Sequence, residues 1–307
     1  MSNNSPEWIK HPITRNGTNS PLTVFTFEKP AKLGFINPET GSHYEGPVNG
    51  DAVRHYLHQR NQRLRIVVVD GVSGSEQLDL PDGYTSPAIY AKDCAIETIP
   101  QAKDLTETLL EINTKLHDPI KGVLSPNVCV SVADTELTES GITAEFLRAG
   151  DCEIYGYRTI GGWFQILDED MLTDTGRLQF ENLKVELLPE INKVRTEVGM
   201  NSPAFKKLFA AFQRREEEIL GNQTNWRSLP IGRYDTAKLK SRGFMTAKEA
   251  ELEAILLTSD GPHISDRQPF TEVLNEHGRP SNIPSTFFES RREGWNDIAA
   301  AMVIAGR

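Results

Sequence analysis

The stretch "LRIVVVDGVSGSE" at residues 64–76 has the pattern of a buried strand that ends at a carboxylate. Four branched apolar residues lead directly into Asp70 and Gly71, and small residues follow. A continuous apolar run between turn residues is typical of a strand covered on both faces. Two interpretations are open: an ordinary Asp-Gly turn, or a charge held where another group must approach the backbone closely.

The composition is that of a globular protein with an excess of acid. The chain has 307 residues, of which 38% are hydrophobic and 25% charged, so it can bury a sizeable core. Its formal net charge of −10 argues against nucleic acid as a partner, because phosphate binding uses clustered Lys and Arg. The three cysteines are widely spaced, which disfavours both a disulfide framework and a zinc ribbon.

The sequence shows no signal for a membrane or for secretion. Its apolar runs are all shorter than the roughly 18–20 residues that span a bilayer. The polar N-terminal segment lacks the apolar core of a signal peptide. We therefore expect a cytoplasmic protein without a membrane partner.

The order of the elements indicates one domain, residues 1–307, with a helical insertion. We expect a loose arm over residues 1–20 and helices over 103–117 and 269–278. Strands are expected at 22–29, 64–69, 127–133, 142–150, 152–158, 162–167, 254–260 and 298–306. The four between 127 and 167 are close together, which favours an antiparallel meander. The region from about 175 to 245 has a helical pattern, with an apolar stripe of Phe205, Leu208, Phe209, Phe212 and Ile219 after the cap Ser202-Pro203.

Short acidic motifs recur next to the predicted strands. They are "NGD" (49–51), "DG" (70–71), "GDC" (150–152), "SDG" (259–261) and "ND" (296–297). Because a sheet aligns the ends of neighbouring strands, we expect Asp70, Asp260 and Asp297 at one rim. Carboxylate and carbonyl oxygens are the ligands that Mg²⁺ and Mn²⁺ prefer. Each motif alone is an ordinary turn signal, and it is their joint order that indicates a metal site.

That order resembles the metal-dependent protein phosphatases of the type 2C class. The motifs cover roughly residues 45–304, and their order and spacing carry the resemblance. The resemblance implies an α+β fold, a four-layer αββα sandwich of two antiparallel sheets flanked by helices. It further implies two Mn²⁺ or Mg²⁺ ions and a third, weaker one. The reaction implied is hydrolysis of phosphoserine or phosphothreonine in a protein substrate, without a covalent intermediate.

The resemblance also assigns roles to individual residues. Asp70 would bridge two metal ions, and the Gly71 carbonyl would bind one of them. Asp260 would hold the other side of the pair, and Asp51 would contact it directly or through water. The last ligand would come from Asn296 or Asp297, and Asp151 would lie near the third ion. No catalytic residue beyond the metal ligands is implied.

The chain departs from the family pattern at four places. Gly46 stands where many relatives have a phosphate-binding Arg, which leaves the phosphate ligand unassigned, with Arg54 as a substitute or a plain surface residue. Val72 replaces a His that some relatives use as a general acid. Asp266 lies two residues later than the expected acid, and Asn296 replaces the usual metal-binding Asp. Asn296 and the missing phosphate-binding Arg favour a second hypothesis, an inactive relative that serves as a binding or regulatory module.

Other classes of site fit the sequence less well. A haloacid-dehalogenase-type phosphatase needs a second acid at the position of Val72. The phosphate-binding glycine loops of nucleotide enzymes are absent. His55 and His58 are interpreted as surface residues. Cys129 lies in an apolar strand and Cys152 follows an acid, so neither is expected to be a nucleophile.

Overall fold

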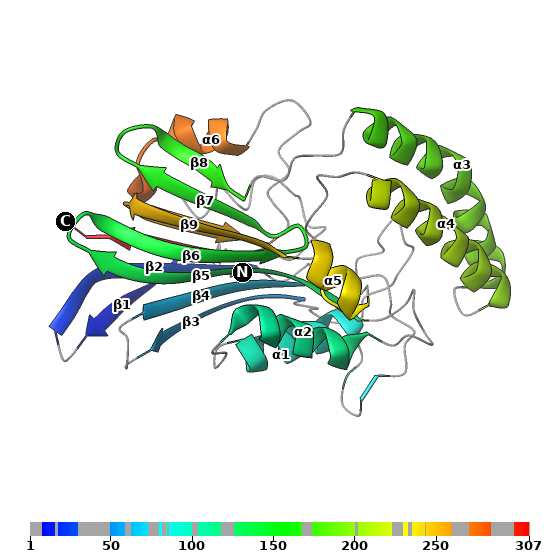
Figure 1. Cartoon of the computed structure of the whole chain (residues 1–307), viewed down its shortest axis with the longest axis horizontal. Helices are drawn as coiled ribbons and strands as arrows, with labels where there is room; N and C mark the ends of the chain where they lie inside the picture. Colours follow the sequence, from blue (N-terminus) through cyan, green and yellow to red (C-terminus); the bar gives the residue numbers. More distant parts are fainter. Residues whose placement is uncertain are drawn as a thin grey trace, which may run out of the picture.

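Two antiparallel sheets form the centre of the molecule (Figure 1). The computed structural model describes residues 8–15, 18–29, 50–58, 63–72, 80–81, 84, 86–99, 104–117, 126–167, 174–199, 202–222, 230–232, 235–242, 244–259, 270–283 and 298–306. Within these residues, a six-stranded sheet has the order β1-β2-β11-β10-β7-β8, and a five-stranded sheet has the order β3-β4-β5-β6-β9. The strands are β1 (Ile9–Arg15), β2 (Thr18–Lys29), β3 (Asp51–His58), β4 (Arg63–Val72), β5 (Asn127–Thr138), β6 (Gly141–Ala149), β7 (Glu153–Arg158), β8 (Gly162–Ile166), β9 (Met245–Leu252), β10 (Ala254–Thr258) and β11 (Ile298–Ala305).

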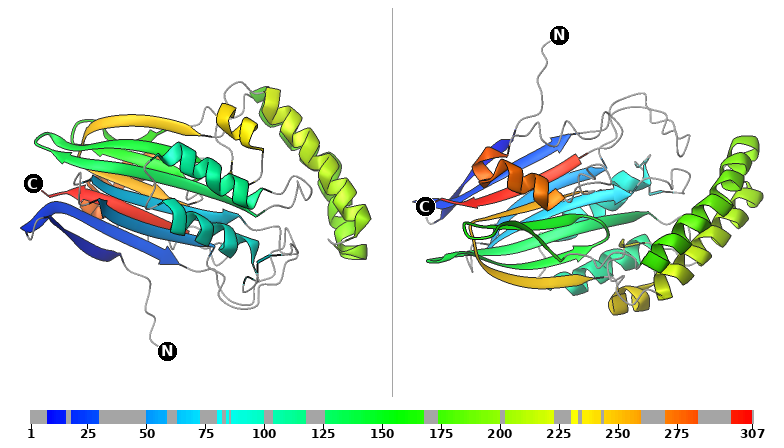
Figure 2. Two further views of the ribbon diagram at one scale, coloured as in Figure 1. Left: turned by 60° about the horizontal axis from the view of Figure 1, so that its bottom comes forward. Right: turned by 90° about the horizontal axis from the view of Figure 1, so that it is seen from above.

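Helices cover both outer faces of the stacked sheets (Figure 2). Helices α1 (Pro87–Thr98) and α2 (Leu105–Leu116) pack on the five-stranded sheet, and α6 (Phe270–His277) packs on the six-stranded sheet. The 3₁₀ turn Pro280–Asn282 follows α6. The predicted four-layer αββα sandwich is thereby confirmed. No helix of the described residues is long and apolar enough to cross a membrane.

β4 is buried on both faces, as the apolar run predicts. Val68 is 0% exposed and belongs to the core between the two sheets. Val67 and Val69 point the other way and pack with residues of α1 and α2. Because successive side chains of a strand alternate between faces, Asp70 lies on the same face as Val68, toward the space between the sheets.

The helices predicted at 103–117 and 269–278 are present as α2 and α6. Asp104 caps α2 by accepting a hydrogen bond from the Glu107 N–H (2.9 Å), and the apolar face at Leu109 and Ile112 is buried. Gly278 follows α6 with a φ of 74°, the left-handed conformation that commonly ends a helix at glycine.

The expected loose arm at residues 1–20 is wrong where the structure describes it. Ile9–Arg15 forms β1, an edge strand paired with β2. Ile13 is only 6% exposed, and the Trp8 ring packs edge-on to Phe25 at 6.5 Å between centroids. Pro12 is compatible with an edge strand, where a missing N–H need not break a ladder.

The expected meander of residues 127–167 is also wrong. β5 and β6 pair in the five-stranded sheet, whereas β7 and β8 pair in the six-stranded sheet. The chain therefore crosses from one sheet to the other at residues 150–152, and the Gly-Asp motif lies at this crossing instead of in a paired hairpin. Gly150 has a φ of 79°, which L-residues rarely adopt, and this allows the abrupt change of direction.

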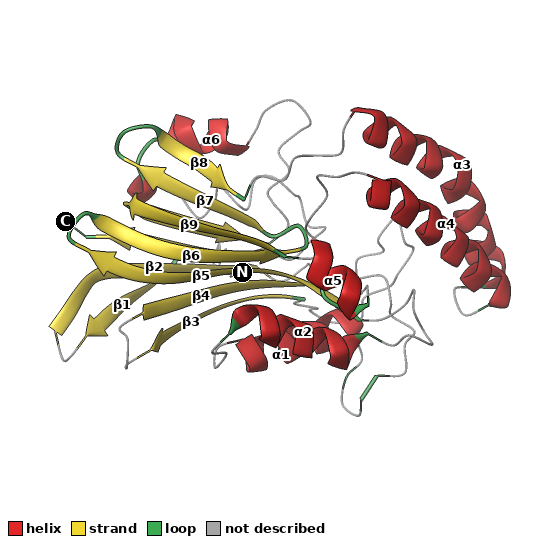
Figure 3. Cartoon of the chain, viewed as in Figure 1, coloured by secondary structure: helices red, strands yellow, loops and turns green. Residues whose placement is uncertain are grey.

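The helical region consists of a long hairpin followed by a short helix (Figure 3). α3 (Asp174–Val198) and α4 (Pro203–Asn222) form the helical hairpin, and α5 (Thr236–Arg242) contacts α2. The apolar stripe predicted on α4 packs against residues of α3 such as Leu183 and Ile191. The helical hairpin stands beside the end of the sandwich at which β4 ends.

Candidate metal centre

Two carboxylates occupy directly paired positions at one end of the five-stranded sheet. Asp51, the first residue of β3, is the cross-strand partner of Asp70 on β4. Paired Cα atoms in antiparallel strands are about 4.5–5.5 Å apart, and their side chains lie on the same face. Asp51 is 2% exposed and Asp70 is partly buried. Both carboxylates therefore lie on the inner face, at the edge of the core that contains Val53 and Val68.

The next two strands continue the same row. Asp70 pairs with Cys129 on β5, and the neighbouring pair Val130–Ala149 places Gly150 beside Cys129. We call this row, Asp51, Asp70, Cys129 and Gly150, the acidic rim, together with Asp151, which follows it. A Cβ atom on Gly150 would lie 2.3 Å from the Cys129 sulfur, so the thiol side chain occupies the space that only glycine leaves open.

The Cys129 thiol lies close to two of the predicted ligands. Burial raises its pKa well above the ordinary value, and the negative charges of Asp151 and Asp70 raise this pKa further. Cys129 is thus held as a neutral thiol, as expected for a buried cysteine that is not a nucleophile. The same interactions indicate that Asp70 of β4 and Asp151 of the crossing after β6 approach one side chain.

Gly71 has a packing role that the sequence did not reveal. Its N–H donates to the Gly50 carbonyl at 2.9 Å, which closes the end of the β3–β4 ladder. A Cβ atom at this position would lie 2.2 Å from the Ala88 carbonyl oxygen in the first turn of α1. Glycine is therefore required here for the close approach of a helix, whatever its own carbonyl binds.

The remaining predicted ligands flank two paired strands of the other sheet in the sequence, β10 and β11. The last residues of β10 and the first of β11 pair, and the Ser259 N–H donates to the Ala299 carbonyl at 2.9 Å. The Ser259 hydroxyl in turn accepts from the Ala299 N–H at 2.9 Å. Asp260, Asn296 and Asp297, which flank these residues in sequence, lie outside the described residues, as do Gly46, Asn49 and Asp266.

The described part of the site fits a hard divalent cation without completing its ligand set. Two carboxylates opposite each other repel, and a buried charge needs an opposite charge or a metal ion. Mg²⁺ and Mn²⁺ take such oxygen ligands together with main-chain carbonyls and water. Within the described ranges, no three His, Cys, Asp or Glu side chains come together closely enough to hold a metal ion.

Arg54, the candidate phosphate ligand, lies away from the acidic rim. Its Nη1 donates to the Glu28 carboxylate (3.3 Å) and to the Val53 carbonyl (2.7 Å). Strand alternation turns Arg54 to the face opposite Asp51 and Val53. Glu28 also accepts from the Val53 N–H at 2.7 Å. Arg54 thus joins β3 to β2 of the other sheet, and the surface interpretation is the better one.

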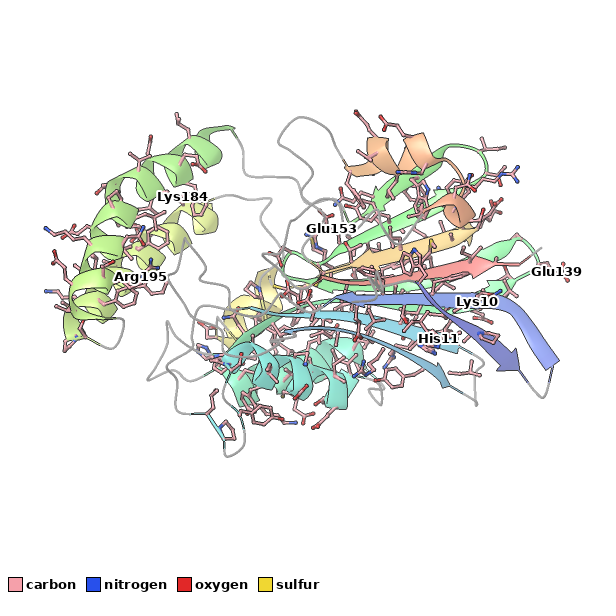
Figure 4. The ribbon with its side chains drawn as sticks, turned by 180° about the vertical axis from the view of Figure 1, so that it is seen from behind. Lys10, His11, Glu139, Glu153, Lys184 and Arg195 are labelled. Atoms are coloured by element: carbon pink, nitrogen blue, oxygen red, sulfur yellow. The ribbon has the colours of Figure 1, made fainter. Side chains whose placement is uncertain are left out.

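Two charged residues near the acidic rim were missed in the sequence. Arg148, two residues before Gly150, is 3% exposed on the inner face of β6. The alternation of Ile142, Ala144 and Phe146 along the same face could have revealed that it points inward. Glu153 begins β7 and accepts a hydrogen bond from the Tyr155 hydroxyl. Figure 4 shows Glu153 at the end of the sheet that faces the helical hairpin, and Glu139 at the opposite end.

Comparison with solved structures places this fold among bacterial serine/threonine phosphatases. RsbX in complex with magnesium is 8% identical, with 97% of this chain and 98% of that chain covered and a TM-score of 0.52. The S. agalactiae serine/threonine phosphatase is 12% identical, with 92% and 99% covered and a TM-score of 0.50. No protein-family model and no curated protein sequence matches this chain significantly. The resemblance to type 2C phosphatases is therefore confirmed for the fold.

Proposed function

We propose that this protein is a Mn²⁺- or Mg²⁺-dependent phosphatase that hydrolyses phosphoserine or phosphothreonine in protein substrates. The observation that carries the proposal is the Asp51–Asp70 pair at the inner edge of a sandwich whose fold is that of such phosphatases. The magnesium in the RsbX structure supports a divalent ion for this fold. In the proposed site, Asp51, Asp70 and the Gly71 carbonyl hold two ions with Asp260 and Asn296 or Asp297, and Asp151 lies near a third.

The chain's own residues hold and shield the ions in this proposal. When bound, a pair of divalent ions would lower the pKa of a water molecule and neutralise charge on the phosphoryl oxygens. The burial of Asp51 strengthens its interaction with a cation, because the local dielectric constant is low. Val72 offers no proton, so the leaving-group oxygen takes its proton from water.

The helical insertion, residues 175–245, is proposed as a flap that reads the protein substrate. The helical hairpin lies beside the end of the sandwich that carries the acidic rim. Its α3 exposes Leu178 and Val185, 63% and 75% accessible, which lie seven residues apart and so on one side of the helix. These side chains provide an apolar surface for contact with a folded substrate.

A second function, that of a catalytically inactive binding or regulatory module, is favoured by one sequence feature. Asn296 lacks the negative charge that the last metal ligand usually provides. Such a module would keep the sandwich and use the acidic rim for binding without turnover.

Hydrolysis of an aryl phosphate and of a phosphothreonine peptide, titrated with Mn²⁺, tests the two functions. Wild type should show metal-dependent turnover, which Asp70→Asn should abolish, since the amide removes the bridging charge. Glu139→Gln is the matched control, because Glu139 is exposed at the opposite end of the sheet (Figure 4). Asn296→Asp should tighten Mn²⁺ binding, and Asp297→Asn should weaken it only if Asp297 is the ligand.

The outcomes separate the hypotheses. Absence of turnover at millimolar Mn²⁺, with no metal-induced rise in melting temperature, would rule out the metal centre. Absence of turnover with a clear metal-induced rise, lost in Asp70→Asn, would favour the inactive module.

A further inference from the structure

Arg148 is a buried cation one step inside the acidic rim. It pairs with Ser131 across β5 and β6, in the next row on the same face as Cys129 and Gly150. With 3% of its surface exposed, its guanidinium has left water almost completely. Such a charge is tolerated only where hydrogen bonds and opposite charges replace its hydration. The partners of Arg148 therefore indicate what the residue is for.

Two main-chain carbonyls accept hydrogen bonds from this side chain. Arg148 Nε donates to the Gly150 carbonyl at 3.1 Å, and Nη1 donates to the Leu167 carbonyl at 3.0 Å. Gly150 begins the crossing between the sheets, directly before Asp151. Leu167 directly follows β8, the last strand before α3, so its carbonyl marks the base of the helical insertion.

Both accepting residues have unusual backbone conformations. Gly150 has a φ of 79° and Leu167 a φ of 60°. For leucine this left-handed conformation is unfavourable and persists only where the surroundings hold it. The Arg148 side chain supplies such a restraint at Leu167, and the same guanidinium restrains the Gly150–Asp151 turn.

The planar guanidinium suits this double contact. Its nitrogens are held in a rigid fork and can donate to two acceptors in different directions. A lysine ammonium is a compact charge on a flexible stem and would reach one carbonyl at a time. From this geometry we infer that Arg148 is a positioning residue, which ties the Gly150–Asp151 turn to the base of the helical insertion and so fixes Asp151 at the acidic rim.

The chain that returns from the helical hairpin is held beside the acidic rim by a separate contact. The Ile231 N–H and carbonyl form two hydrogen bonds of 2.9 Å with Val128, next to Cys129 on β5. The Gly232 N–H donates to the buried Asn113 side chain at 2.6 Å. β6 ends at Ala149, where the chain crosses to the other sheet, so it no longer covers this part of β5. Ile231 pairs with β5 there instead. Loss of Arg148 should release the insertion at Leu167 and leave the contact at Ile231 in place.

Hydrogen–deuterium exchange of the metal-free protein tests the positioning role. Arg148→Met removes both contacts, and we expect exchange in peptides covering 150–153 and 162–167 to rise about tenfold or more, the loss typical of a charged hydrogen bond. Peptides covering 51–58 and 230–232 should stay near their wild-type exchange. Arg148→Lys should recover protection in one of the two affected peptides.

Arg65→Lys is the matched control. Arg65 is likewise a buried arginine of the five-stranded sheet, bound to Asp134 by two hydrogen bonds and to the Ile99 carbonyl by a third. It lies on the outer face, under α1, so its loss should raise exchange around residues 99 and 134. A rise spread evenly over all peptides in Arg148→Met, or no rise in 150–153, would overturn the positioning role.

Mn²⁺ binding, measured by electron paramagnetic resonance, tests whether Arg148 affects the proposed metal site. This second test rests on the proposed function. Removal of residues that orient a metal ligand typically weakens binding about 10–100-fold. Arg148→Met should weaken the weakest Mn²⁺ step by this factor, and Arg65→Lys should not. If wild type binds no Mn²⁺, the proposed function fails, and the exchange result still decides the role of Arg148. Unchanged Mn²⁺ binding despite raised local exchange would show that the turn does not position an ion ligand.

Discussion

The core between the sheets and the core of the helical hairpin are built from different parts of the chain. Leu64 of β4 packs in a cluster that includes Leu22, Ile154 and Val303 from three strands of the other sheet. In the helical hairpin, the apolar cluster around Leu183 and Phe205 consists of residues of α3 and α4 among the described residues. The first core joins segments distant in sequence, whereas the second joins two consecutive helices. We therefore expect the sandwich to unfold as one unit and the helical hairpin to open separately.

The largest effect is expected from a cavity in the sandwich core. Leu64→Ala should lower the free energy of unfolding by about 2–5 kcal/mol, because Leu64 is 0% exposed and its neighbours are held by two sheets. Urea unfolding followed by tryptophan fluorescence should show one main transition that moves to lower urea in the variant. A main fluorescence transition that splits in two would contradict a single unit, whereas an additional transition seen only by circular dichroism belongs to the helical hairpin.

A comparable truncation in the helical hairpin should act locally. Phe205 is 5% exposed and stacks on Phe209 at 5.5 Å between ring centroids. Phe205→Ala should make the hairpin a site of rapid limited proteolysis while the unfolding midpoint of the sandwich moves by less than about 1 kcal/mol. A shift of the main transition as large as that of Leu64→Ala would show that the two cores are one cooperative unit.

Two glycines, one in the sandwich and one in the helical hairpin, are required for different reasons, the first by close packing and the second by its backbone conformation. Gly71→Ala should cost about 1–3 kcal/mol, since the new methyl would collide with the Ala88 backbone and shift α1. Gly199→Ala, at the end of α3, meets open space and should cost only about 1–2 kcal/mol, for its φ of +79°. Differential scanning calorimetry of the metal-free variants measures both. The first should lower the main transition, and the second should leave it unchanged.

The smallest effect is a pH dependence confined to the sandwich. The ring of His55 on β3 lies 4.6 Å from that of His11 on β1, and the pKa of His55 is lowered by burial and then by His11. The unfolded chain therefore binds the His55 proton more readily, so stability falls as the pH drops from about 6.5 through the lower folded pKa. Unfolding midpoints of wild type and His55→Gln between pH 7.5 and 5 should converge at acidic pH. A parallel course of the two curves would exclude this contribution. Residues 174–222 contain no histidine, so the hairpin should not share it.

Strands whose own residues carry a clear apolar pattern could be predicted from the sequence. Strands whose conformation depends on packing against distant segments could not. The run at 66–69 identified β4, and the position of Asp70 at its end followed directly. β1 was missed because "IKHPITR" contains Lys10 and Pro12, which weaken the pattern of a strand. At this sheet edge the conformation is decided by the packing of Trp8 and Ile13. α1 was missed although Ser86-Pro87 is the same start signal as Ser202-Pro203, since its buried face is made of small alanines.

The candidate site divides in the same way. The order of the acidic motifs led to Asp51 and Asp70, which the structure places as cross-strand partners. The crossing at Gly150 has no local signal, because a short turn between two strands looks the same whether they share a sheet or not. The contacts of Arg148 with Gly150 and Leu167, and the contact between Val128 and Ile231, exist only because the chain crosses between the sheets there. The sequence therefore predicted the carboxylates, but it did not predict the residues that position them.

The Glu28 carboxylate also covers part of the edge of the five-stranded sheet. β3 is the outermost strand of the five-stranded sheet, and an outermost strand offers its unused N–H groups to any extended chain. Because Glu28 accepts the Val53 N–H and draws Arg54 over the same edge, a foreign strand would have to displace a charge before it could add to the sheet. We therefore expect the contact that joins the two sheets to disfavour edge-to-edge pairing at this strand.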